Sequence, residues 1–257
     1  MNLTRCLVVV VVTELLSLAI ARLLLHFYEP MSFQVESIRT VLRIATASIY
    51  WWLMRPLILS RTTNTSTFRS PLLIFGLFLF LLVPAVVGHY NLSPPLAIFF
   101  AVTSVPVAVK EEFLFRGIVQ NLLAEKFGFV KSVLFTSTLF TAWHIGAMEP
   151  TVWTFSQIFL ASILLGVLYV HSGSILAAIV IHTAYDALFS FTPMLSAPLN
   201  ENWGFVPLLA SVALVSFWAL HGAHGLTCLS GWSVPAAFRS TRRQFTSDYK
   251  RSDTGPS

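Results

Sequence analysis

Long apolar runs separated by short polar connections dominate this chain. The runs are about 17 to 25 residues long, the length that an α-helix needs to cross the hydrocarbon core of a bilayer. Eight of them occur, at residues 6–28, 40–59, 70–89, 95–112, 131–148, 153–170, 174–191 and 205–221. The pattern therefore predicts an all-α protein, a polytopic transmembrane helical bundle of about eight spanning helices.

Three of these runs have special features. The run at 40–59 contains Arg43 and Arg55, which leaves open a partly interfacial helix. The run at 95–112 passes into a charged segment and predicts a helix that continues to about Phe127. The first run, with Ala19-Ile-Ala21, also fits a cleaved signal peptide. Because Glu14 interrupts its apolar core and apolar residues continue beyond the cleavage site, we expect an uncleaved first helix.

Composition supports a membrane protein and excludes an ordinary soluble fold. Charged residues make up 11% of the chain and hydrophobic residues 56%, with a mean hydropathy of +0.76. Soluble domains carry about 25% charged residues, so most of this apolar surface must face lipid or other helices. In a membrane protein, the formal charge of +5 reflects basic residues in the loops between helices. We therefore expect the lipid bilayer as partner and no nucleic acid.

Basic residues collect on one side of the eight-span arrangement, and cytoplasmic loops are enriched in Lys and Arg. This predicts a multi-pass membrane protein with both termini in the cytoplasm, in the cell (inner) membrane if the source is bacterial. Four regions follow: N-terminal transmembrane helices at 1–94, a core at 95–191 that carries the motifs described below, a last transmembrane helix at 192–221 and a polar, basic cytoplasmic tail at 222–257.

Ionisable side chains are few in the middle of the chain. Each such group within a span is disfavoured by about 2.5 to 3.5 kcal/mol on insertion scales, so those that occur tend to be functional or paired. The candidates are Glu111, Glu112, Arg116, His144, His182 and Asp186, on the fourth, fifth and seventh runs.

Spacing separates the two glutamates. Glu112 and Arg116 are four residues apart on a helix, with the acid first, which favours an ion pair. Glu111 lies about 100° away around the helix and is left uncommitted. A free carboxylate can act as a general base. The alternative is that all three residues only cap a helix at the membrane surface.

Two histidines stand on other apolar runs. His144 is predicted to lie deep in the fifth run, and His182 is four residues from Asp186, which could orient its imidazole. A lone histidine can instead be a hydrogen-bonded core residue, and the second pair can be purely structural. The coincidence of polar groups on three otherwise apolar spans favours a common functional site.

Three motifs in order carry a family resemblance. Residues 111–116 read EExxxR, residues 140–144 read FxxxH from Phe140 to His144, and residues 182–186 read HxxxN with Asp in the last place. Together they resemble the CPBP family, the CAAX prenyl endopeptidases and bacteriocin-processing, Abi-type membrane proteins, over roughly residues 95–190.

The resemblance implies an intramembrane glutamate protease. Glu111 would be the catalytic glutamate, activating water with His144, while His182 and residue 186 would stabilise the oxyanion. Glu112, Arg116 and Phe140 would support the site. Asp186 is a departure, because an ionised Asp cannot donate a hydrogen bond to an oxyanion. We expect it to orient His182.

We expect no cofactor, because Glu111 already has a role as base and no HExxH helix is present. Two histidines and a glutamate could instead hold zinc; inhibition by chelators, reversed by added zinc, would support that alternative. The predicted partner is a membrane-tethered peptide or protein substrate. The remaining alternatives are a non-catalytic immunity or scaffold membrane protein and a transporter that uses the same buried groups.

Overall fold

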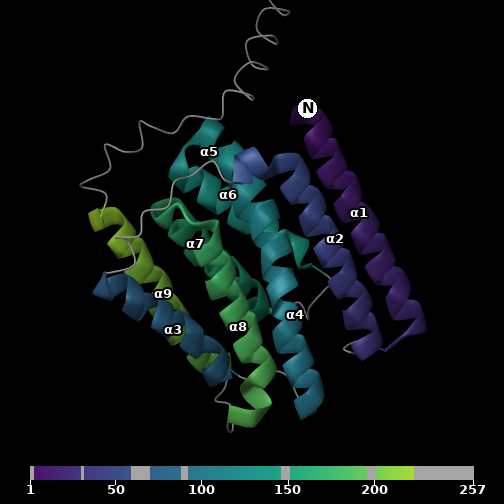
Figure 1. The fold of residues 1–257 in the computed structure, drawn as a ribbon. Helices are drawn as coiled ribbons and strands as arrows, with labels where there is room; N and C mark the ends of the chain where they lie inside the picture. Colours follow the sequence, from purple (N-terminus) through teal and green to yellow (C-terminus); the bar gives the residue numbers. More distant parts are fainter. Residues whose placement is uncertain are drawn as a thin grey trace, which may run out of the picture.

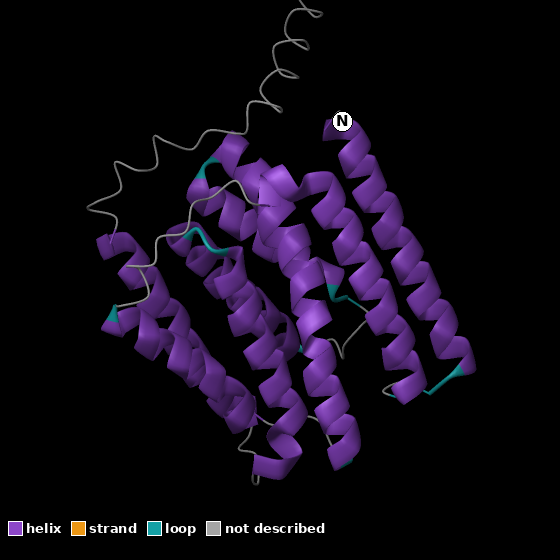
Figure 2. Ribbon diagram, in the orientation of Figure 1, coloured by secondary structure: helices purple, strands orange, loops and turns teal. Residues whose placement is uncertain are grey.

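The computed structural model describes residues 3–29, 32–58, 70–87, 92–145, 151–195 and 201–222. Within these ranges the regular structure consists of helices, without a strand (Figure 2). The helices, in chain order, are α1 (Leu3–Phe27), α2 (Phe33–Ile58), α3 (Pro71–Val87), α4 (Pro94–Glu112), the π-helix η2 (Phe113–Gln120), α5 (Asn121–Phe127), α6 (Phe129–Trp143), α7 (Val152–Ser172), α8 (Ile175–Leu195) and α9 (Glu201–Gly222).

Each of the eight apolar runs forms a helix, so the all-helical prediction is confirmed. By length and composition, 7–27 of α1 and 152–172 of α7 are long and apolar enough to cross a bilayer. Shorter apolar helices occupy 71–87, 175–191 and 204–219. The protein is therefore a helical membrane bundle. The predicted tail lies outside the described residues, apart from its first residue.

Helices that are distant in sequence pack side by side (Figure 1). α3 packs along α9, α4 packs along α8, and α7 contacts both α6 and α9. α1 lies at the edge of the bundle against α2, and its outer face presents Val8, Val12, Leu15 and Leu16. An apolar face of this kind suits lipid. The packing of α4 against α8 brings the charged end of α4 to the middle of α8.

The helix that begins with α4 continues to Phe127, as predicted, but its winding changes. Residues 113–120 form a π-helix directly after Glu112. Such wide turns are rare and often mark functional sites. Two polar side chains secure this stretch: Gln120 donates to the carbonyl of Gly166 at 3.1 Å, and Asn121 donates to the carbonyl of Leu57 at 3.0 Å. The change of winding begins directly after the two glutamates, and the spacing of residues in the sequence does not predict it.

Candidate active site

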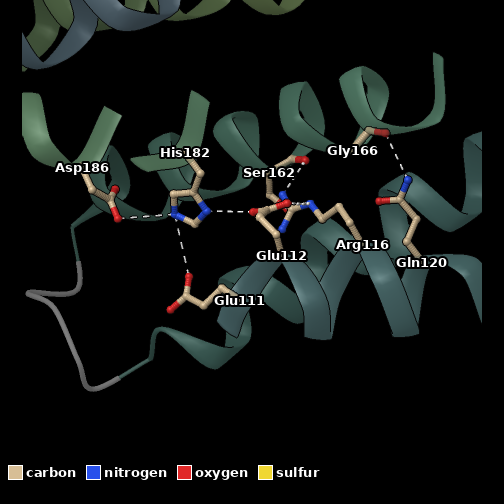
Figure 3. Close-up of polar contacts among 8 residues, drawn as sticks. All are labelled: Glu111, Glu112, Arg116, Gln120, Ser162, Gly166, His182 and Asp186. Atoms are coloured by element: carbon tan, nitrogen blue, oxygen red, sulfur yellow. Dashed lines mark hydrogen bonds and ion pairs between the residues drawn. The ribbon is translucent and has the colours of Figure 1, made fainter. Parts of the chain in front are cut away.

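The charged motifs meet where the end of α4 faces the middle of α8 (Figure 3). Glu111 and Glu112 form the last residues of α4, and Arg116 follows in η2. His182 and Asp186 lie one turn apart on α8. The structure thus brings the first and third motifs into direct contact.

Glu112 is the centre of this network. Its Oε2 lies 3.2 Å from Arg116 Nε, the pair expected from the spacing, and its Oε1 accepts a hydrogen bond from His182 Nδ1 at 2.8 Å. The side chains of Glu112 and Arg116 are both completely buried. Because a buried carboxylate needs compensating partners, these two contacts stabilise Glu112 inside the bundle.

Arg116 is held from three directions. Its Nη2 donates to the carbonyl and to the hydroxyl of Ser162 on α7, at 3.1 and 3.0 Å. Its guanidinium also lies 4.9 Å from the centre of the Phe140 ring, which is close enough for a cation–π contact. The arginine therefore joins η2, α6 and α7 behind Glu112.

The second nitrogen of His182 faces two further carboxylates. Nε2 lies 3.9 Å from Glu111 Oε2 and 3.5 Å from Asp186 Oδ2. The shortest contact of the ring, however, is the one that Nδ1 makes with Glu112. Glu112 therefore orients the imidazole, and Asp186 approaches the nitrogen that points toward Glu111 (Figure 3). The expectation that Asp186 orients His182 overlooked this nearer partner, which is 70 residues away in sequence.

His144 does not lie deep in a span, and that prediction is wrong. α6 ends at Trp143, and His144 is its C-terminal cap, because the backbone N–H groups of His144 and Ile145 bond to carbonyls only three residues back. His144 Nδ1 lies 2.8 Å from the carbonyl of Phe140. The helix end places this imidazole near the carboxylates of Glu111 and Asp186.

Phe140 packs between the two histidines. Its ring centre lies 4.6 Å from that of His144 and 6.1 Å from that of His182, and the residue is 5% exposed. Together with its contact with Arg116, this packing makes Phe140 the apolar support on which both imidazoles rest.

A known protein family matches the part of the chain that carries these motifs. Residues 93–188 match the family described as type II CAAX prenyl endopeptidase Rce1-like. This match supports the resemblance of the segment to the CPBP family. No curated protein and no solved structure matches the chain. Proteases of this family act on membrane-associated proteins, which supports peptidase activity for this chain.

The CPBP segment contains every residue of the three motifs. Two residues of the surroundings were missed at the sequence level. Ser162 carries no signal, because a lone serine in an apolar helix is common. Arg43 was noted only as a charge in the second run, yet it lies on α2, outside the CPBP segment, with its charge acting on both Glu111 and Asp186.

Arg43 is held in place by Glu36, which is 3% exposed. α2 begins at Phe33, earlier than the run at 40–59 indicated, and so includes both residues in one helix. Within the described ranges, no three His, Cys, Asp or Glu side chains are arranged as metal ligands.

Proposed function

We propose that the protein is an intramembrane endopeptidase of the glutamate type, which cleaves a membrane-associated peptide or protein tail. Glu111 is the general base, and the observation that carries this role is the unequal commitment of the two adjacent glutamates. Glu112 is completely buried and contacts both Arg116 and His182, whereas the Glu111 side chain is 13% exposed. Its contact with His182 at 3.9 Å is too long for a hydrogen bond.

In the proposed reaction, Glu111 and His144 hold a water molecule beside the scissile carbonyl. Glu111 takes a proton from this water as its oxygen attacks the carbonyl carbon, and the carbonyl oxygen becomes an oxyanion. A proton on His182 Nε2 stabilises that oxyanion. The intermediate collapses when the C–N bond breaks, and the proton held by Glu111 passes to the leaving amine.

His182 is suited to this role by its contact with Glu112. Because a carboxylate only accepts, Nδ1 must donate the proton in the 2.8 Å bond. The ring can then act as a donor at Nε2 only when that nitrogen also carries a proton. The carboxylates of Glu111 and Asp186 near Nε2 supply the negative charge that an imidazolium needs.

Asp186 serves this imidazolium rather than the oxyanion directly. We expect Asp186→Asn to leave the fold intact and to retain at least part of the cleavage activity, because Asn still accepts from Nε2 and can also donate to the oxyanion. Single-turnover cleavage by the purified variant measures this. Complete loss of cleavage in a folded Asp186→Asn protein would show that the carboxylate itself is required.

We further propose that the mechanism needs no metal, because the base, the water-holding group and the oxyanion donor are all side chains of this chain. The arrangement in the membrane is part of the proposal: a multi-pass protein with both termini in the cytoplasm. In a bacterial source it would lie in the cell membrane.

The experiment is a substrate search in membranes with and without the protein. New peptide termini are identified by mass spectrometry with wild type, Glu111→Ala and His144→Ala. A terminus that depends on both residues supports the proposal and names the substrate. If the biological effect of the protein persists in Glu111→Ala without any new terminus, the protein is a binding or scaffold factor. Ion flux in proteoliposomes without cleavage would indicate a transporter.

A further inference from the structure

We propose that the buried ion pair between Glu14 on α1 and Lys110 on α4 is a positioning device for the active site. This inference rests on the proposed peptidase function. Glu14 and Lys110 act without touching the substrate. They hold Glu111 through the end of α4, and they hold His144 through the contact of Lys110 with Trp143 on α6.

Glu14 joins three helices at one buried point. Its Oε2 lies 2.7 Å from Lys110 Nζ, and its Oε1 accepts a hydrogen bond from the hydroxyl of Tyr50 on α2. Glu14 is 4% exposed, Lys110 8% and Tyr50 0%. α1 packs mainly against α2, and this ion pair connects it to α4 as well.

Lys110 adjoins both of the proposed catalytic groups. It immediately precedes Glu111 in the chain. Its ammonium also lies 5.3 Å from the centre of the Trp143 ring, and Trp143 immediately precedes His144. The buried ammonium thus belongs to the residue before the proposed base and contacts the residue before its imidazole partner. Moving Lys110 would displace both neighbours.

The position of Lys110 depends on Glu14. A buried ammonium without its carboxylate is strongly disfavoured, so it must either move toward water or lose its proton. Either response changes the end of α4 beside Glu111. Glu14 and Tyr50 both lie outside the CPBP segment at 93–188, so the N-terminal helices contribute to a site whose motifs they do not carry. This also explains why the lipid-facing helix α1 keeps an acid in its middle.

Glu14→Gln tests the inference, with Ser17→Ala as its matched control. Ser17 lies one turn further along α1, and its hydroxyl is 3.3 Å from that of Thr46 on α2, so the control weakens α1–α2 contact without touching Lys110. We expect Glu14→Gln to lower kcat about 10- to 100-fold with little change in KM, the size of effect that small misplacements of reacting groups produce. Ser17→Ala should keep the wild-type kcat.

Hydrogen exchange gives a readout that is independent of catalysis. In Glu14→Gln, amides of residues 110–116 and 143–145 should exchange faster than in wild type, whereas Ser17→Ala should leave them unchanged. Unchanged exchange in Glu14→Gln would overturn the inference. If Glu14→Gln shows this faster exchange but the wild-type protein cleaves no substrate, the proposed function fails while the positioning contact stands.

A double-mutant cycle with Lys110→Met separates positioning from general stability. If the pair acts as a unit, the kcat loss in Glu14→Gln/Lys110→Met should be no larger than in Lys110→Met alone. Glu14→Asp, which keeps the charge, should retain most of the activity. Losses that multiply in the double variant, or a Glu14→Asp protein as inactive as Glu14→Gln, would contradict the proposal.

Discussion

Glu111→Gln is expected to reduce peptide cleavage by about 10²- to 10⁴-fold, the usual contribution of a general base. Glutamine has nearly the same shape as glutamate but cannot take a proton from water. The turnover of purified protein in detergent or proteoliposomes measures the effect on the substrate found in membranes. Thermal unfolding should change little, because the Glu111 side chain makes only the 3.9 Å contact with His182 among the ion pairs of the described residues.

Glu125→Gln is the matched control for this prediction. Glu125 is an exposed glutamate on α5, in the same continuous helix and beyond the π-helical turn. Removing its charge should leave turnover unaltered. If Glu111→Gln retains turnover within a few-fold of Glu125→Gln, the base lies elsewhere and the proposed mechanism is wrong.

The second large effect concerns stability. Arg116→Met should lower the free energy of unfolding by about 3 to 5 kcal/mol, the range found when one partner of a buried ion pair is removed. The reason is that Glu112, which is completely buried, would keep only His182 as a cationic partner. The two hydrogen bonds to Ser162 would be lost as well. Thermal unfolding of the purified protein in detergent measures the change.

A second variant shows that the uncompensated charge is the cause. Arg116→Met/Glu112→Gln removes both charges and should recover a substantial part of the lost stability. Lys126→Met, at an exposed position on α5, should shift the free energy of unfolding by less than about 0.5 kcal/mol. Equal melting temperatures for Arg116→Met and Lys126→Met would contradict the assigned role of Arg116.

Helix positions were largely predictable because the bilayer imposes a length on each apolar run. All eight runs correspond to helices, and the continuous helix to Phe127 follows from the charged segment after 95–112. The start of α2 was not predictable in this way. Glu36, Arg39 and Arg43 lower the apolarity of its first turns, and the pairing with the two arginines allows Glu36 to be buried there.

The residues of the site were predictable because ionisable groups are rare in apolar spans. Their partners were harder to predict. The choice of Glu112 over Asp186 as the group that orients His182 joins α4 to α8 across 70 residues. Local spacing favours the pair that lies one turn apart, and it says nothing about a carboxylate from another helix. The same limit hid the pair of Glu14 and Lys110, which are 96 residues apart.

The sequence by itself therefore determined the helical class, the approximate positions of the helices, the family suggested by three motifs and the set of polar side chains available for chemistry. Apolar periodicity and the rarity of buried charge are local properties, and they can be read along one chain. Only the tertiary structure decided which carboxylate meets which cation, that His144 ends α6, and that α1 reaches α4 through one buried ion pair. Those contacts depend on how helices pack, because each buried charge takes whichever partner the neighbouring helix presents.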